Sequence, residues 1–383
     1  MKPTWIPLSD PDITHDELDA VSEVLQSPQL SAGPMVQRFE AAFAEYIGRK
    51  HAVAVASGTL GLMLALDAAG VGARDEVIAS PYSWRECAHA IGLVGATPVF
   101  SDIDYWAGTL VPEKAEACLG ARTKAIVAGN TNGHPAPWAK LREVAARHRL
   151  VLIEDSTEAI GSLYQGKPVG SFGDLSVFDF SQPCPIACGE GGMVVTDDDD
   201  YAGLLRRLRS RRTDERASVV FGLTAPYQCG MSDLSAALGL KQLQRIETIL
   251  EKRKRTERLY FEYVQSFEGI KDPYVAPEVD EVHWFLYLVH LGTRFALSSR
   301  DAIVEDLRTE SVEAAAYSNP MHLQRRYLEL GYRRGSLFVT EKVADRAVAL
   351  PFHTHLTEEQ VAFIIGTMKD ASINVGAGTA IYL

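Results

Sequence analysis

Short apolar runs alternate with amphipathic segments over the first two thirds of the chain. The apolar runs lie at 51–56, 75–80, 97–103, 124–129, 150–155, 176–181 and 191–198. Each is long enough for a buried strand, and helical patterns separate most of them. Buried strands that alternate with helices are typical of a mostly parallel sheet with helices on both faces. The pattern therefore predicts an α/β fold.

Capping residues mark where several of the helices begin. Thr14 and Glu17 form a capping box that predicts a helix in the segment after them. Ser57 precedes a second helical pattern, and Ser232 precedes a third. The third pattern predicts one long helix over 233–264.

The pattern changes after about residue 255. A strand is predicted at 283–291, with helices at 299–310 and 357–371. We therefore expect a large α/β domain over 1–255 and a smaller C-terminal α/β domain over 256–383.

Composition excludes several classes of partner. The chain has 383 residues, of which 46% are hydrophobic, and its formal net charge is -12. An acidic surface disfavours nucleic acid and anionic membranes. No apolar stretch reaches the roughly 18–20 residues of a membrane span, and the first residues lack the apolar core of a signal peptide. Five cysteines in a chain of this length indicate reduced thiols, so we expect a cytoplasmic protein.

Three candidate ligand-binding features follow predicted strands, where ligands bind in open α/β sheets. Ser57, Gly58 and Thr59 open a helix whose backbone N–H groups could hold a phosphate, although this is also an ordinary N-cap. Trp84 could stack on a ring or belong to the core. Asp155 could pair with a protonated pyridine nitrogen or cap a helix.

Motifs across nearly the whole chain resemble one family, the fold type I sugar aminotransferases of the DegT/StrS type, which use pyridoxal phosphate. The motifs include "DEVIASPYSW", "LVLIEDSTEAIGSLYQGKPVGSFGDLSVFDF", "GEGG", "MSDLSAALGLKQLQRIE" and "ALPFHTHLTEEQV". The resemblance implies a homodimer with the active site at the subunit interface, where the loop 224–233 reaches the neighbouring pocket. It also implies a keto sugar linked to a nucleotide, or a keto cyclitol, as substrate.

Four positions match the family's cofactor site. By resemblance, Gly58 and Thr59 belong to the turn that holds the cofactor phosphate, and Trp84 stacks on the cofactor ring. Asp155 matches the carboxylate that pairs with the pyridine nitrogen and makes the ring an electron sink.

Other positions depart from the family pattern. The resemblance places Cys184 at the Schiff-base lysine and Asp179 at a phosphate-binding serine. Glu158 replaces a glutamine near the phenolic oxygen of the cofactor, and Gln228 replaces a phosphate-binding asparagine. Two added carboxylates would repel a phosphate dianion and an ionised phenol.

Transamination requires an amine that forms a Schiff base with the cofactor, and the position of that amine is one of those that depart from the family pattern. The chain has no lysine between Lys167 and Lys241, and Lys167 falls in a turn that the family keeps at the surface. A thiol at Cys184 forms no imine and does not shuttle the proton as an amine would. We therefore expect Cys184, Asp155 and Glu158 to be the residues that decide the chemistry. Pyridoxal or pyridoxamine phosphate would bind weakly and without a covalent link, or no cofactor would bind at all.

Four functions remain open from the sequence. The first is an enzyme that acts on a keto sugar or cyclitol by other chemistry, in polysaccharide or natural-product biosynthesis, like family members that use pyridoxamine phosphate as dehydratases. The others are a non-catalytic structural or regulatory partner of an intact relative, an ordinary aminotransferase, and a metal or thiol site at Cys184, Cys188 and Cys229. Arg85 and His322 are candidate substrate-binding residues, and Arg85 could instead pair with a nearby carboxylate.

Overall fold

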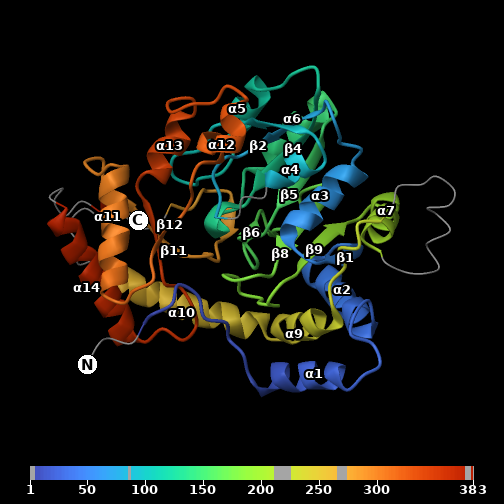
Figure 1. Ribbon diagram of the computed structural model, residues 1–383, viewed down its shortest axis with the longest axis horizontal. Coiled ribbons are helices and arrows are strands. Elements are labelled where there is room, and N and C mark those ends of the chain that lie inside the picture. The colour runs from blue at the N-terminus through green and yellow to red at the C-terminus, as the bar shows by residue number, and fades with distance from the viewer. Residues whose placement is uncertain (1–4, 85–87, 211–225, 265–273, 376–380, 383) are drawn as a thin grey trace.

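A seven-stranded sheet forms the centre of the molecule in the computed structural model, which describes residues 5–84, 88–210, 226–264, 274–375 and 381–382 (Figure 1). The strand order is β1-β9-β8-β5-β4-β2-β3. The strands are β1 His51–Val55, β2 Glu76–Ala79, β3 Thr97–Phe100, β4 Thr123–Gly129, β5 Val151–Asp155, β8 Leu175–Asp179 and β9 Gly192–Thr196. Each lies within or overlaps one of the seven predicted apolar runs.

The sheet is mostly parallel, as the alternation of strands and helices predicted. Strands β3, β2, β4, β5 and β8 pair in parallel, and β9 is antiparallel to both of its neighbours, β8 and β1. No helix separates β8 from β9 in the chain, and β9 runs back beside β8 in the opposite direction.

Helices cover both faces of this sheet. In β4, Ala125 and Val127 pack into one apolar cluster and Ile126 and Ala128 into another on the opposite face. Three of the described helices cover the first face: α3 Gly58–Ala68, α4 His89–Leu93 and α7 Asp199–Arg209. Four others cover the opposite face: α2 Pro34–Ile47, α5 Pro112–Ala117, α6 Trp138–His148 and α9 Asp233–Gln244. Burial on both faces explains why the strands have continuous apolar runs.

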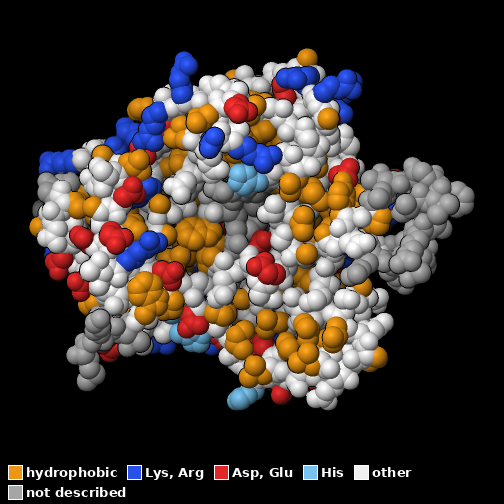
Figure 2. Space-filling view, viewed as in Figure 1, with side chains coloured by type: hydrophobic (Ala, Val, Ile, Leu, Met, Phe, Trp, Pro, Cys, Tyr) orange, Lys and Arg blue, Asp and Glu red, His pale blue; other side chains and the backbone are white. Residues whose placement is uncertain are grey.

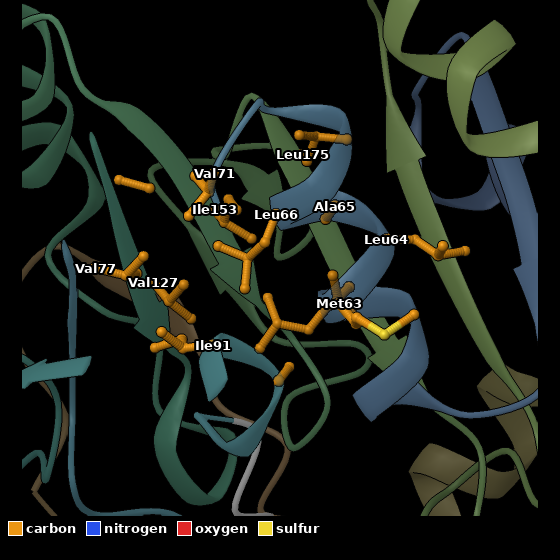
Figure 3. Packing of buried hydrophobic residues seen from close by; sticks show 14 of the residues in the cluster. Met63, Leu64, Ala65, Leu66, Val71, Val77, Ile91, Val127, Ile153 and Leu175 are labelled. Carbon is orange, nitrogen blue, oxygen red and sulfur yellow. The ribbon is translucent and has the colours of Figure 1, made fainter. Parts of the chain in front are cut away.

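Helix α3 is anchored over the middle of the sheet. Several of its apolar side chains, among them Leu62 and Leu66, are fully buried, and Figure 3 shows Leu66 between α3 and the strand residues Val127 and Ile153. The mixed large and small apolar side chains leave little freedom for the helix axis. The N-terminus of α3 is therefore held at the carboxyl edge of the sheet.

The predicted helix over 233–264 is two helices, α9 and α10 Ile246–Val264, with Arg245 between them. Helix α1 (His15–Leu25) packs on α9, and Figure 1 shows it beneath α9 at the lower edge of the molecule. The predicted capping box of α1 is confirmed, since the N–H of Thr14 donates to Glu17 at 2.8 Å. The guanidinium of Arg245 reaches back to Glu17 and to Asp12, so this break between the helices also holds α1 in place.

Two smaller sheets and several further helices complete the fold of the described residues. The remaining strands are β6 Leu163–Tyr164, β7 Lys167–Pro168, β10 Val279–Glu281, β11 Tyr287–Leu291, β12 Ala315–Ala316, β13 Ala347–Leu350 and β14 Ile381–Tyr382. The helices are α11 Leu297–Thr309, α12 Arg325–Leu328, α13 Phe338–Ala344 and α14 Glu358–Asn374, with 3-10 turns η1 Thr131–Gly133 and η3 Met321–Leu323. The predicted boundary at residue 255 falls inside α10, and the two-domain division stays a prediction. Among the described helices, none combines the length and the apolar character that crossing a membrane requires.

Candidate active site

The register of the sheet brings three strand ends to one level. Gly192, the first residue of β9, pairs with Val55 at the end of β1 on one side and with Asp179 at the end of β8 on the other. The chain continues from Val55 into the N-cap of α3, where Ser57 accepts a hydrogen bond from the N–H of Leu60. The N-terminus of α3 therefore faces Asp179.

The carboxylate of Asp179 occupies the N-terminus of α3. The N–H of Gly58 donates to Oδ2 of Asp179 at 2.7 Å, and the N–H and hydroxyl of Ser181 donate to Oδ1, with 2.9 Å for the N–H. Asp179 is 6% exposed. A Cβ at Gly58 would lie 2.6 Å from Cβ of Asp179, so only glycine permits this approach. Helix N-termini attract anions, and here the anion is a side chain of the chain itself.

We expect Asp179→Ala to lower the free energy of unfolding by about 1–3 kcal/mol, because the N–H groups of Gly58 and Ser181 would remain buried without this acceptor. Urea denaturation measures the change. Asp198→Ala is the matched control, since Asp198 caps α7 at an exposed position and should cost about 1 kcal/mol or less. A cost for Asp179→Ala no greater than that of the control would contradict a buried capping role.

Glu158 joins three segments of the chain. Its Oε1 accepts from the N–H of Trp84 and its Oε2 from the N–H of Asn132, each at 2.8 Å. The hydroxyl of Tyr317 also donates to Oε2. Burial, with the nearby charge of Glu158, raises the pKa of Tyr317 well above its usual value, so that hydroxyl stays a donor. Both carboxylate oxygens of Glu158 therefore accept hydrogen bonds from the chain itself.

Aromatic rings surround this carboxylate. The ring of Trp84 lies 6.1 Å from that of Tyr317, and the ring of Tyr82 lies 5.2 Å from Tyr317 on centroid distances. Trp84 is half-buried. A stacking role for Trp84 stays a prediction, and its indole packs here as part of an aromatic cluster.

Asp155 ends β5 and is 9% exposed. Its Oδ1 accepts from the N–H of Thr157 at 3.1 Å and from the hydroxyl of Thr157. The segment after Asp155 forms turns and no helix, so the reading of Asp155 as a helix N-cap is wrong. The side-chain acceptor instead closes a local turn, which is a common use of aspartate after a strand.

Cys184 lies in a buried part of the site, 8% exposed, within an apolar cluster that also contains Cys188. Burial raises the pKa of the Cys188 thiol well above its usual range, and Cys184 and Asp179 are close enough to add to the effect. Burial also lowers the pKa of Arg253 to about 10, with Cys184 acting in the opposite direction. Cys184 therefore lies near both a second thiol and a buried guanidinium.

The remaining predicted site residues lie beside this centre, in a separate buried contact, or outside the described residues. Thr59 is half-buried in the first turn of α3, and Gln228 is exposed in a loop held beside the end of β1 by the N–H of Ala56, which donates to the carbonyl of Cys229. His322 is fully buried with Nε2 3.0 Å from Oε1 of Glu341. Arg85 lies outside the described residues.

The ordinary aminotransferase would need a lysine, and the metal or thiol site would need the cysteines to lie together. Lys167 is exposed in β7, as expected of a surface turn. Within the described ranges, no group of three or more histidine, cysteine, aspartate or glutamate side chains is arranged to hold a metal ion. Cys229 packs in the apolar cluster on the α3 face and Cys184 in the cluster on the opposite face.

Sequence reasoning missed two partners of Glu158. Tyr317 and Asn132 lie 159 and 26 positions from it. No local pattern relates residues at such separations, because the contacts arise where loops from different strands meet. Glu158, three residues after the predicted strand 150–155, was the available signal, because a buried carboxylate requires several hydrogen-bond donors and therefore predicts such partners.

The mostly parallel sheet with helices on both faces and polar residues at its strand ends defines an α/β protein. The family model described as "DegT/DnrJ/EryC1/StrS aminotransferase family" matches residues 11–369. The chain therefore belongs to this family of sugar aminotransferases.

Related proteins match almost the whole chain. The spore coat polysaccharide biosynthesis protein SpsC of Bacillus subtilis is 34% identical over 377 residues, which cover 96% of this chain and 97% of SpsC. GDP-perosamine synthase of Caulobacter vibrioides is 35% identical over 370 residues, with 96% and 98% covered. The putative sugar aminotransferase Spr1654 from Streptococcus pneumoniae, solved in its pyridoxamine phosphate form, aligns with a TM-score of 0.89 at 27% identity over 97% of this chain and 98% of its own. The fold is therefore fold type I.

Proposed function

We propose that this protein is a sugar aminotransferase family member that does not carry out lysine-dependent transamination. The observation that carries the proposal is the 2.7 Å hydrogen bond from the N–H of Gly58 to Asp179. By family resemblance, this helix N-terminus would hold the cofactor phosphate. A phosphate dianion would have to share it with a buried carboxylate of like charge, which disfavours binding. The residues present therefore do not fit a phosphate-bearing cofactor.

The thiol at Cys184 supports the same proposal. Schiff-base chemistry needs an amine close to the cofactor, and the resemblance places Cys184 where that amine would be. Cys184 is 8% exposed and packs with apolar side chains. Lys167, the lysine that is nearest in sequence before it, is exposed at the surface. The geometry thus favours a site without a Schiff-base amine, in which Asp179 and Glu158 accept hydrogen bonds from the chain itself.

We propose that the protein acts in sugar biosynthesis for a polysaccharide or natural product, as a structural or regulatory partner in a homodimer or with an intact relative. Asp179, Glu158 and Asp155 all accept hydrogen bonds from the chain itself, which suits a stable scaffold. Figure 2 shows hydrophobic side chains along the lower edge of the molecule, where Figure 1 places α1. Leu18 and Leu25 of α1 are 58% and 61% exposed. Apolar surface of this kind supports a subunit contact.

A second function is supported by the buried pair of Tyr317 and Glu158. A hydroxyl donating to a carboxylate could transfer a proton to or from a bound ligand. This arrangement favours an enzyme that acts on a keto sugar, nucleotide-linked or free, or on a keto cyclitol, by chemistry that needs no lysine. A non-covalently held pyridoxamine or pyridoxal phosphate belongs to this second function.

Borohydride reduction tests the proposal. The protein, incubated with pyridoxal phosphate and reduced, should carry no pyridoxyl group on any lysine of the pocket, because no amine is placed to form the imine. Mass spectrometry of the digested protein reports the modification. An intact family aminotransferase treated in the same way serves as the positive control.

Absorbance during the same incubation separates the two functions. No cofactor band is expected for a cofactor-free partner, whereas a band at about 330 nm would indicate non-covalent pyridoxamine phosphate or a thiol adduct and favour the second function. A pyridoxyl-lysine in the pocket, together with amino transfer to a keto sugar, would restore ordinary transamination as the function and overturn the proposal.

A further inference from the structure

A groove between α11 and α14 lies away from the candidate active site. Figure 1 places the two helices at the left edge of the molecule, apart from β8 and α3. The volume of the groove is about 830 Å³, which includes space open to solvent. Phe363 and Ala371 of α14 form an apolar part of its wall, and Phe363 is 38% exposed. The groove therefore offers an accessible apolar surface that the proposed function does not use.

Carboxylates border this groove without a basic counterpart. Asp306, Glu310 and Asp370 line it, and no lysine, arginine or histidine is among its described lining residues. None of the three carboxylates forms an ion pair with a residue that the structure describes. Like charges that face one groove repel each other and attract a cationic occupant.

A single metal ion does not explain these carboxylates. In the ranges that the structure describes, no group of three or more histidine, cysteine, aspartate or glutamate side chains is arranged to hold one. Carboxylates that are spread along α14 and the end of α11 instead suit several separate positive charges. Phe363 adds an apolar contact, so the groove fits a basic surface that also carries apolar side chains.

The segment 325–334 of the same chain is a surface of this kind. It has four arginines among ten residues, whereas the whole chain has a net charge of -12. Arg325 and Arg326 are exposed, and neither forms an ion pair with a carboxylate of the described residues. Leu328 and Leu330 follow them and are each 45% exposed. Exposed arginines beside exposed leucines are the complement of the groove in both charge and polarity.

A single copy of the chain does not bring the two surfaces together. Figure 1 shows α12, which spans Arg325–Leu328, towards the top of the view, and α11 and α14 at the left edge. Figure 2 shows lysine and arginine side chains over the region of α12 and α13, and aspartate and glutamate side chains along the left edge. Complementary surfaces that stay apart in one folded copy can meet only between copies.

We propose that the segment 325–334 of one copy docks in the groove between α11 and α14 of a second copy. The arginines pair with the carboxylates of the groove, and the two exposed leucines pack against Phe363. The contact is heterologous, because each copy contributes a different surface, so it adds copies in a chain or a ring. It does not involve the loop 224–233, and it does not depend on the state of Asp179 or Cys184.

The net charge of -12 does not prevent this contact. At an ionic strength of about 0.15 M, exposed charges more than about 8 Å apart are largely screened. The charges that meet at the contact are of opposite sign, and they lie closer than this. The local match therefore outweighs the repulsion between the two copies as a whole.

Sedimentation velocity of the full-length protein tests this proposal. The mean mass should rise with protein concentration, with a dissociation constant of about 10–100 µM for a small contact between exposed surfaces. Raising the NaCl concentration from about 0.05 to 0.5 M should weaken the association at least about 5-fold, because the contact joins exposed charges. A mass that does not rise with concentration, or a rise that salt does not weaken, overturns the proposal.

Two charge reversals locate the contact. Arg325→Glu alters only the docking segment and Asp370→Arg alters only the groove, so each variant alone should lose the rise in mass. An equimolar mixture of the two should regain association, because each variant keeps the surface that the other lacks. Arg206→Glu is the matched control, since it makes the same change of charge at an exposed position of α7 and should associate like the unaltered protein.

Two further results would assign these surfaces differently. Binding to phosphatidylglycerol vesicles that Arg325→Glu abolishes, without any self-association, would assign the arginine segment to a membrane surface. A mixture of the two variants that associates no better than either variant alone would mean that the segment and the groove do not meet. Either result overturns the proposal. Thermal unfolding of each variant at the temperature of the unaltered protein shows that the comparison is between folded proteins.

Discussion

The variant that combines Cys184→Lys, Asp179→Ser and Glu158→Gln is expected to bind pyridoxal phosphate at least about 30-fold more tightly than the unaltered protein. Asp179→Ser frees the N–H of Gly58 for the phosphate, and Glu158→Gln removes the second negative charge. Each lost repulsion is worth about 1–3 kcal/mol in a partly desolvated site. The lysine adds the covalent link, which a band at about 410–430 nm reports.

The single variant Cys184→Lys should retain the cofactor poorly, because both carboxylates remain. The matched control combines Asp179→Ser and Glu158→Gln with Cys118→Lys, which places the new lysine at a half-buried cysteine elsewhere. If Cys184→Lys alone binds as tightly as the triple variant, the carboxylates do not oppose the phosphate. If the control forms the same Schiff base, the position of Cys184 has no special relation to the cofactor.

Arg245→Met is expected to lower the free energy of unfolding by about 3–5 kcal/mol near neutral pH. The side chains of Asp12 and Glu17 are only 3% and 1% exposed, and the guanidinium of Arg245 lies 2.6 Å from Asp12 Oδ1 and 2.5 Å from Glu17 Oε1. Removing it leaves two buried carboxylates with less compensation. Methionine keeps the apolar stem, so the loss reflects the charge.

Acid pH should reduce this effect. Burial alone would raise the pKa values of Asp12 and Glu17. Hydrogen bonds from Lys252 and Arg245 to Asp12, and from Thr14 and Arg245 to Glu17, outweigh burial and lower both to about 2. A lowered pKa contributes stability above the ordinary values of 3.8 and 4.5, and that stability is lost as the pH falls towards 2.

Urea denaturation at about pH 7 and about pH 3 should therefore show a smaller difference between the protein and Arg245→Met at the lower pH. Lys252→Met is the control, because Lys252 also contacts Asp12 but is 45% exposed, and it should cost less than about 1 kcal/mol. A difference that stays constant between the two pH values would mean that Arg245 acts by packing and not by its charge.

The strand pattern was readable from the sequence because both faces of the central sheet are buried. All seven apolar runs became strands of one sheet, and Ser57, Thr14 and Ser232 lie at the helix starts where they were expected. Local rules failed at Arg245, where a helical pattern continues across a break. The reason is tertiary, since the side chain of Arg245 is bonded to residues more than 220 positions away.

The family and the fold were also readable from the sequence, because ordered motifs extend over most of the chain, and the family match over 11–369 confirms both. The sequence likewise singled out Cys184, Asp179 and Glu158 as unusual. Their proposed consequence for the cofactor stays a prediction. What each carboxylate contacts could not be read from the sequence, because no local pattern reports which buried donor meets which acceptor.

The sequence by itself determined the alternation of strands and helices, the caps and the family, since these depend on local spacing and on residue types in order. Only the tertiary structure decided that Asp179 caps α3 at Gly58 and that Glu158 joins Trp84 to Asn132 and Tyr317. The physical reason is that a buried carboxylate must find donors wherever the fold brings them. Sheet register and loop packing bring those donors from distant parts of the chain.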